Sequence, residues 1–149
     1  MHVKKNVMMI LAALFVAVSS LSFAASGIYL PYEMPDHAPL YGTYPCIGAS
    51  EASVYYADPS SYYATSDGNV AYLGCTFYAT SGGALPGGGP AKLTPYTAQF
   101  QTYTVNGRRK INYSVTNQNG SPATYFYNTK FLAHVFNLVA SHTWIGSYL

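Results

Sequence analysis

The stretch AQFQTYTVNGRRKINYSV, residues 98–115, decides the fold. Asn106 and Gly107 favour a two-residue type I′ turn, because both positions of that turn need a positive φ angle, which Asn and Gly tolerate. Pairing outward from the turn sets Val105 opposite Arg108 and Phe100 opposite Tyr113. The sequence therefore predicts an antiparallel hairpin over this stretch.

The side chains of this hairpin separate by polarity, because successive residues of a strand point to opposite faces of the sheet. One face is largely apolar and holds Ala98, Phe100, Thr102, Ile111, Tyr113 and Val115. The other is polar and holds Gln99, Gln101, Tyr103, Lys110, Asn112 and Ser114. Such a division predicts a sheet with one side against a core and the other toward water.

A second hairpin is predicted in YYATSDGNVAYLGCTFYAT, residues 62–80. Asp67-Gly68 is the signal for its two-residue turn, which sets Tyr63 opposite Tyr72. The apolar face then collects Tyr62, Ala64, Ala71, Leu73, Cys75, Phe77 and Ala79. The opposite face collects Tyr63, Thr65, Val70, Tyr72, Thr76 and Tyr78. Several tyrosines are thus expected to point away from the core.

The C-terminal third adds shorter elements. Asn119-Gly120 predicts a turn that brings residues 123–127 alongside the first hairpin as a third strand. Residues 129–141 carry apolar side chains at helical spacing, although their Val, Phe and Thr content leaves a strand open. Residues 142–149 are expected to form a closing strand. The predicted fold class is mainly β: an antiparallel β-sandwich or partly open barrel of hairpins, with one short C-terminal helix possible.

The N-terminus is typical of a Sec-type signal peptide. Lys4 and Lys5 precede an uninterrupted apolar run, residues 7–18, which is too short to span a membrane. Small residues at Ser22 and Ala24 then suit cleavage after Ala24, with cleavage after Ala25 as the alternative. We therefore expect export by this leader to the periplasm or the extracellular space.

Removal of residues 1–24 leaves residues 25–149, which we expect to form a single β-rich domain. Its N-terminal segment, residues 27–46, is rich in Pro and is expected to be irregular. The Gly-rich residues 81–90 lack the Lys and the following helix of a phosphate-binding loop, so they are expected to form a surface loop. No later run reaches eighteen apolar residues, so no transmembrane helix is expected.

Two cysteines remain in this domain, Cys46 and Cys75. In an exported chain the default expectation is a disulfide, which would stabilise the fold by about 3–4 kcal/mol. Two free thiols or half of a metal site are the alternatives.

Charge is scarce: only 8% of residues are charged, against about 25% in an ordinary soluble domain. Without the leader, five basic and five acidic residues remain, so the net charge gives no case for nucleic-acid binding. All the acidic residues precede residue 68 and all these basic residues follow residue 91. This segregation makes self-association possible.

The chain's commonest large polar residue is tyrosine, with 16 in the sequence. Tyr combines a rigid ring with a hydroxyl group, a combination that antibody-like contact surfaces use. The candidate ligand-binding or partner-binding residues are Tyr63, Tyr72, Tyr78 and Tyr103. The alternative is that a second layer covers these rings.

Arg108, Arg109 and Lys110 at the tip of the first hairpin are candidates for contact with an anionic surface. Their alternative role is to keep a strand edge from aggregating. No motif assigns catalytic residues, a metal site or a cofactor, so an enzyme is not favoured.

These features predict a disulfide-stabilised binding or adhesion module for a glycan or protein partner at the cell surface. A structural subunit of a surface assembly is the first alternative. Its single predicted disulfide, its length and the penultimate Tyr148 are similar to those of fimbrial subunits, but the N-terminus lacks an alternating apolar donor strand. A small outer-membrane β-barrel is the second alternative.

Overall fold

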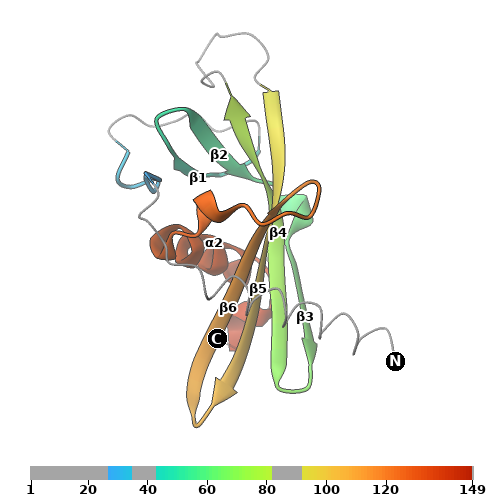
Figure 1. Cartoon of the computed structure of the whole chain (residues 1–149). Coiled ribbons are helices and arrows are strands. Elements are labelled where there is room, and N and C mark those ends of the chain that lie inside the picture. The colour runs from blue at the N-terminus through green and yellow to red at the C-terminus, as the bar shows by residue number, and fades with distance from the viewer. Residues whose placement is uncertain (1–26, 35–42, 82–91, 149) are drawn as a thin grey trace.

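The computed structural model describes residues 27–34, 43–81 and 92–148 (Figure 1). The predicted signal peptide, residues 1–24, therefore lies outside the described residues, as does the predicted Gly-rich loop after Ser81. Part of the segment predicted as irregular, residues 27–46, is described. There Tyr29 forms an isolated antiparallel bridge with Ala49.

Six antiparallel strands form one open sheet, in the order β1-β2-β4-β5-β6 (Figure 1). β3 also pairs with β4, along the same edge of β4 as β2. The first half of β4 pairs with β3 there, and the second half pairs with β2. The strands are β1 Cys46–Ala49, β2 Ser53–Ala57, β3 Tyr63–Asp67, β4 Val70–Ser81, β5 Lys92–Val105 and β6 Arg108–Asn117. A short 3-10 helix, η1 (Pro59–Ser61), connects β2 to β3.

The β5–β6 hairpin has the predicted register. Val105 pairs with Arg108, Phe100 with Tyr113, and the predicted pairs between and beyond them are all present. Asn106 has φ 52° and Gly107 has φ 73°, the positive values that a type I′ turn requires.

The β3–β4 hairpin turns one residue later than predicted. Asp67 pairs with Val70, so the turn residues are Gly68 and Asn69. Gly68 has φ 63°, and a positive φ at the first turn residue alone is the pattern of a type II′ turn, which glycine favours. Each predicted partner on β4 moves along by two positions, which leaves the assignment of faces intact.

The helix α2 (Thr129–Ser141) covers one face of the sheet and contacts β4 and β1 (Figure 1). Its extent matches the prediction, and its buried residues recur at helical spacing: Phe131, Leu132, Val135, Phe136, Val139 and Ala140. The mainly β class and the short C-terminal helix are thus confirmed. The layer facing the sheet is this helix rather than a second sheet.

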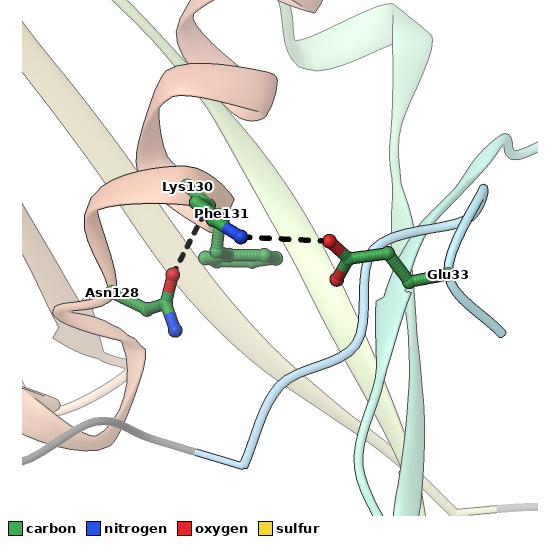
Figure 2. A network of polar contacts seen from close by, with 4 residues as sticks. All are labelled: Glu33, Asn128, Lys130 and Phe131. Atoms are coloured by element: carbon green, nitrogen blue, oxygen red, sulfur yellow. Dashed lines mark hydrogen bonds and ion pairs between the residues drawn. The ribbon is translucent and has the colours of Figure 1, made fainter.

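Local polar contacts fix the start of α2 (Figure 2). The Asn128 side chain accepts a hydrogen bond from the Phe131 backbone N–H at 3.1 Å, which satisfies one of the unpaired N–H groups of the first turn. Lys130 forms an ion pair with Glu33 at 3.7 Å, which ties the N-terminal segment to the helix. The Lys130 side chain is 75% exposed, so the cap contributes more to stability than the ion pair.

The core lies between α2 and the sheet and is rich in aromatic rings. Phe77 is at its centre with no exposed surface. The rings of Tyr55, Tyr96, Phe126 and Phe131 surround it at centroid distances of 5.0–6.5 Å. Most of these pairs meet edge to face, an arrangement that favours a fixed packing.

Two predicted strands are wrong. Residues 123–127 leave the sheet after a single bridge between Thr116 and Pro122, and a 3-10 helix, η2 (Thr124–Phe126), follows. Pro122 cannot donate to a strand ladder, and Phe126 gains burial in the core instead.

The predicted closing strand is also a 3-10 helix, η3 (Trp144–Tyr148). A Cβ atom on Gly146 would stand 2.3 Å from the Ala140 carbonyl oxygen, so glycine lets the chain fold back closely on the end of α2.

The predicted disulfide is absent: Cys46 and Cys75 are both free thiols. Cys46 lies opposite Tyr56 of β2, and Tyr56 lies opposite Tyr78 of β4, so these three share a face. Cys75 is three residues from Tyr78 and lies on the core face. Two strand spacings separate the cysteines sideways by about 10 Å, whereas a disulfide needs Cα atoms within about 7 Å.

Candidate functional site

The sheet face opposite α2 brings together much of the predicted site. Strand pairing places its side chains in rows across β3, β4, β5 and β6. We call this surface the tyrosine face; its three rows are Tyr63–Gly74–Gln99–Ser114, Thr65–Tyr72–Gln101–Asn112 and Asp67–Val70–Tyr103–Lys110.

Tyr63, Tyr72 and Tyr103 occupy successive rows on neighbouring strands, so they form a diagonal line. Diagonal neighbours in an antiparallel sheet are about 7–8 Å apart. The predicted direct pairing of Tyr63 with Tyr72 is wrong, because the shifted turn sets Tyr63 opposite Gly74 and Tyr72 opposite Thr65.

The Tyr63 ring lies over Gly74. A Cβ atom at Gly74 would stand 2.9 Å from Tyr63 Cε1, so the absence of a side chain makes room for the ring. Burial raises the pKa of Tyr63, and a hydrogen bond with Gln99 offsets part of the rise. Tyr63 is still 38% exposed, which leaves ring surface for a ligand.

Amide side chains lie beside the rings of Tyr72 and Tyr103, because Gln101 is opposite Tyr72 and Asn112 is opposite Gln101. Asn112 Nδ2 donates to Gln101 Oε1 at 3.4 Å and lies 3.5 Å from the Tyr103 hydroxyl. Gln101 is only 7% exposed, so its orientation is set by packing as well as by this contact. The tyrosine face therefore offers rings and amide groups held by paired strands.

Tyr78 is on the same side of the sheet but does not join the other three. It pairs with Tyr56 on β2 and Pro95 on β5, and its ring stacks on that of Tyr44 at 6.0 Å. Six residues separate it from Tyr72, about 20 Å along the strand.

The three basic residues at the β5–β6 tip are all exposed, but they do not point the same way. Arg109 pairs with Thr104 and belongs to the core side, whereas Arg108 and Lys110 belong to the side of the tyrosine face. The structure therefore does not gather the predicted cationic residues on one face.

Sequence reasoning missed a groove on the opposite side of the sheet. Its volume is about 570 Å³, and we call it the aromatic groove; the lining residues used below are Ser50, Tyr55, Tyr96, Asn117, Tyr125 and Phe126. Tyr125 is 47% exposed, whereas Phe126 is buried beneath it. The groove was not predicted because residues 123–127 were expected to form a strand, and a strand would not place Tyr125 and Phe126 on a turn above β2 and β5.

Tyr55 is the most buried tyrosine of the groove, and its hydroxyl donates a hydrogen bond to Ser50 Oγ at 2.9 Å. Burial raises the pKa of Tyr55, and the neighbouring hydroxyls of Tyr125 and Tyr96 raise it further. Tyr55 therefore stays protonated across the physiological pH range, and its proton is held by Ser50.

A second cavity of about 410 Å³ lies at the other end of the core side, between the hairpin tips and η3. Ser66, Thr102, Thr104, Arg109 and Trp144 are among its lining residues. The Trp144 indole donates to the Ala64 carbonyl oxygen at 2.9 Å and so anchors η3 to β3.

Among the described residues, no three His, Cys, Asp or Glu side chains come together as a metal site would need. Likewise, no helix in the described part of the chain is long and apolar enough to cross a membrane.

No known family model matches the chain, and searches of curated proteins and of solved structures also found no match.

Proposed function

We propose that this protein is an exported binding module that holds a neutral glycan on its tyrosine face. The observation that carries the proposal is the line of Tyr63, Tyr72 and Tyr103, with the amides of Gln99 and Asn112 beside it. The buried Gln101 contacts Asn112 from below. Tyrosine rings can stack on the apolar face of a sugar, and amide groups both donate and accept, as sugar hydroxyls require.

Charge on this surface supports a neutral ligand. The first two rows contain no Asp, Glu, Lys or Arg, and charge enters only in the third row with Asp67 and Lys110. An acidic glycan would need basic groups along the whole line of rings, but the basic residues on this side of the sheet, Lys110 and Arg108, lie only at its Tyr103 end. Regular strand pairing on both sides of β4 and β5 also holds the rings in place before binding, which lowers the entropic cost of association.

A glycan array with the purified protein tests the proposal. We expect binding to one class of neutral oligosaccharide. The variant with Tyr63, Tyr72 and Tyr103 all replaced by Ser is expected to lose at least about 100-fold in affinity, since buried aromatic contacts contribute about 2 kcal/mol or more when they dominate an interface. Its melting temperature should stay close to that of the parent protein.

The matched control is Tyr125→Ala, which removes an exposed ring on the opposite side of the sheet and should leave glycan affinity unchanged. An array without hits, or a triple variant that still binds with parent affinity, would overturn the proposal. If the protein instead binds a protein partner through these three tyrosines, the tyrosine face is the binding site but a neutral glycan is not its ligand.

Export rests on the predicted leader, residues 1–24. N-terminal sequencing of protein recovered from the producing cell is expected to begin at Ala25. A mature protein that begins at Met1 would exclude cleavage, and with it this part of the proposal.

A further inference from the structure

The aromatic groove has the construction of a binding site and lies on the side of the sheet away from the tyrosine face. Phe126 forms its centre, with the rings of Tyr96, Tyr55 and Tyr125 at centroid distances of 4.7, 5.1 and 5.5 Å. The three tyrosines meet Phe126 edge to face, so their orientations are mutually fixed. Its volume of about 570 Å³ is in the usual range for ligand sites.

Two polar groups of the groove have donors left for a ligand. Asn117 Oδ1 accepts hydrogen bonds from the backbone N–H groups of Asn119 and Ser121, at 2.9 and 3.1 Å. This contact fixes the carboxamide and leaves the two N–H donors of Nδ2 on the other side. Ser50 Oγ accepts from Tyr55, so the Ser50 hydroxyl can donate its own proton.

Charge again limits the class of ligand, because none of the described residues that line the groove is charged. A ligand suited to it is neutral, offers apolar rings to tyrosine, and presents carbonyl oxygens rather than N–H groups. Proline has all three properties, because its side chain is an uncharged apolar ring and its backbone has no N–H. In a polyproline II helix its carbonyl groups also point outward without internal hydrogen bonds. Aromatic-lined grooves are a recurring way to bind such segments.

We propose that the aromatic groove binds a neutral proline-rich peptide segment in the polyproline II conformation. Prolyl rings pack against Tyr125 and Tyr96, and peptide carbonyl oxygens accept from Asn117 Nδ2 and the Ser50 hydroxyl. A neutral sugar fits less well here, because its hydroxyls also need acceptors, the Asn117 oxygen already accepts two hydrogen bonds, and the other lining side chains offer only hydroxyl oxygens.

Fluorescence anisotropy with two labelled probes tests this proposal: decaproline, and a Gly-Ser decapeptide of equal length. We expect saturable binding of decaproline and none of the Gly-Ser peptide. Tyr125→Ala should weaken decaproline binding by at least tenfold, whereas Tyr125→Phe, which keeps the ring, should retain most of it. Asn117→Asp provides a second test, since it removes the Nδ2 donors and should weaken binding by fivefold or more.

The matched control is Tyr63→Ala, an exposed ring on the tyrosine face, which should leave decaproline affinity unchanged. Circular dichroism of each variant separates loss of binding from loss of folding. The proposal is overturned if decaproline fails to bind, if Tyr63→Ala weakens it as much as Tyr125→Ala, or if a neutral oligosaccharide competes for the groove. None of these outcomes decides glycan binding on the tyrosine face, because that test uses different residues and a different ligand.

Discussion

Alternating residues of β4 and β5 point to the core face and to the tyrosine face. The two faces differ in how deeply their side chains are buried. Leu73 and Phe77 on the core face have no exposed surface, whereas Tyr63, beside the same strand on the other face, is 38% exposed. Tyrosine occurs on both: Tyr55 is buried under the aromatic groove. Composition therefore does not distinguish a tyrosine of the tyrosine face from a core tyrosine in this protein; the strand register does.

The largest expected difference between the faces is in stability. Replacing Phe77 by Ala removes the ring at the centre of the aromatic core, and we expect a loss of about 3–5 kcal/mol in the free energy of unfolding. Tyr78→Ala is the matched control, because Tyr78 is the next residue and points to the other face, where its ring stacks on that of Tyr44. Urea denaturation measures both losses. Equal losses would mean that the tyrosine face is as tightly packed as the core.

Alkaline pH should weaken the core face in a characteristic way. Burial, together with the charge of Asp58, raises the pKa of the Cys75 thiol to about 12, and burial is also the main reason why the pKa of Tyr62 rises to about 12. Their protonated forms are thus favoured in the folded state, so the contribution of these two groups to stability is constant below about pH 9 and falls as the pH rises toward 12. Each group contributes a slope of up to about 1.4 kcal/mol per pH unit.

Urea denaturation between pH 7 and 11 checks this slope, and Cys75→Ala should flatten it above pH 9. A Cys75→Ala variant with the parent's pH dependence would show that the thiol does not titrate differently in the folded and unfolded states.

The two hairpins show how much of this arrangement the sequence could predict. Asn106-Gly107 fixed its register because both residues take a positive φ, the condition that defines the turn. Asp67-Gly68 has the same signal, but Gly68 with Asn69 also makes a permitted turn, and local chemistry alone does not choose between them. The turn at Gly68-Asn69 moves the pairing by two residues. The predicted assignment of side chains to faces is therefore correct, whereas the predicted pairing of Tyr63 with Tyr72 is not.

The parts that could not be predicted depend on packing between distant segments. Phe126 leaves the sheet to join Tyr55, Phe77 and Phe131, a gain in burial that no local pattern around residues 123–127 reveals. The aromatic groove depends on that same departure. The disulfide was predicted from the export context, whereas strand order, which separates Cys46 from Cys75, is not encoded in spacing.

Gly74 provides a smaller test, on the tyrosine face alone. A Cβ atom there would stand 2.3 Å from the Ala98 carbonyl oxygen and 2.9 Å from the Tyr63 ring. Gly74→Ala should therefore destabilise the protein by about 1–3 kcal/mol through overpacking, and displace the ring. Gly27→Ala is the control, since nothing lies within 4 Å of its Cβ position. Thermal denaturation and the glycan affinity of Gly74→Ala together check the contact; unchanged values for both would exclude it.

The smallest expected effect is that of a reducing agent, and it tests whether the two cysteines lie on opposite faces. Dithiothreitol should leave the melting temperature unchanged, because Cys46 shares a face with Tyr56 and Tyr78 while Cys75 is 1% exposed in the core. Iodoacetamide in urea without reductant should modify both thiols, as mass spectrometry can count. A bridged chain would resist modification until reduced and would lose about 3–4 kcal/mol on reduction. That result would require β1 to lie directly beside β4, which is incompatible with the pairing of β2 between them.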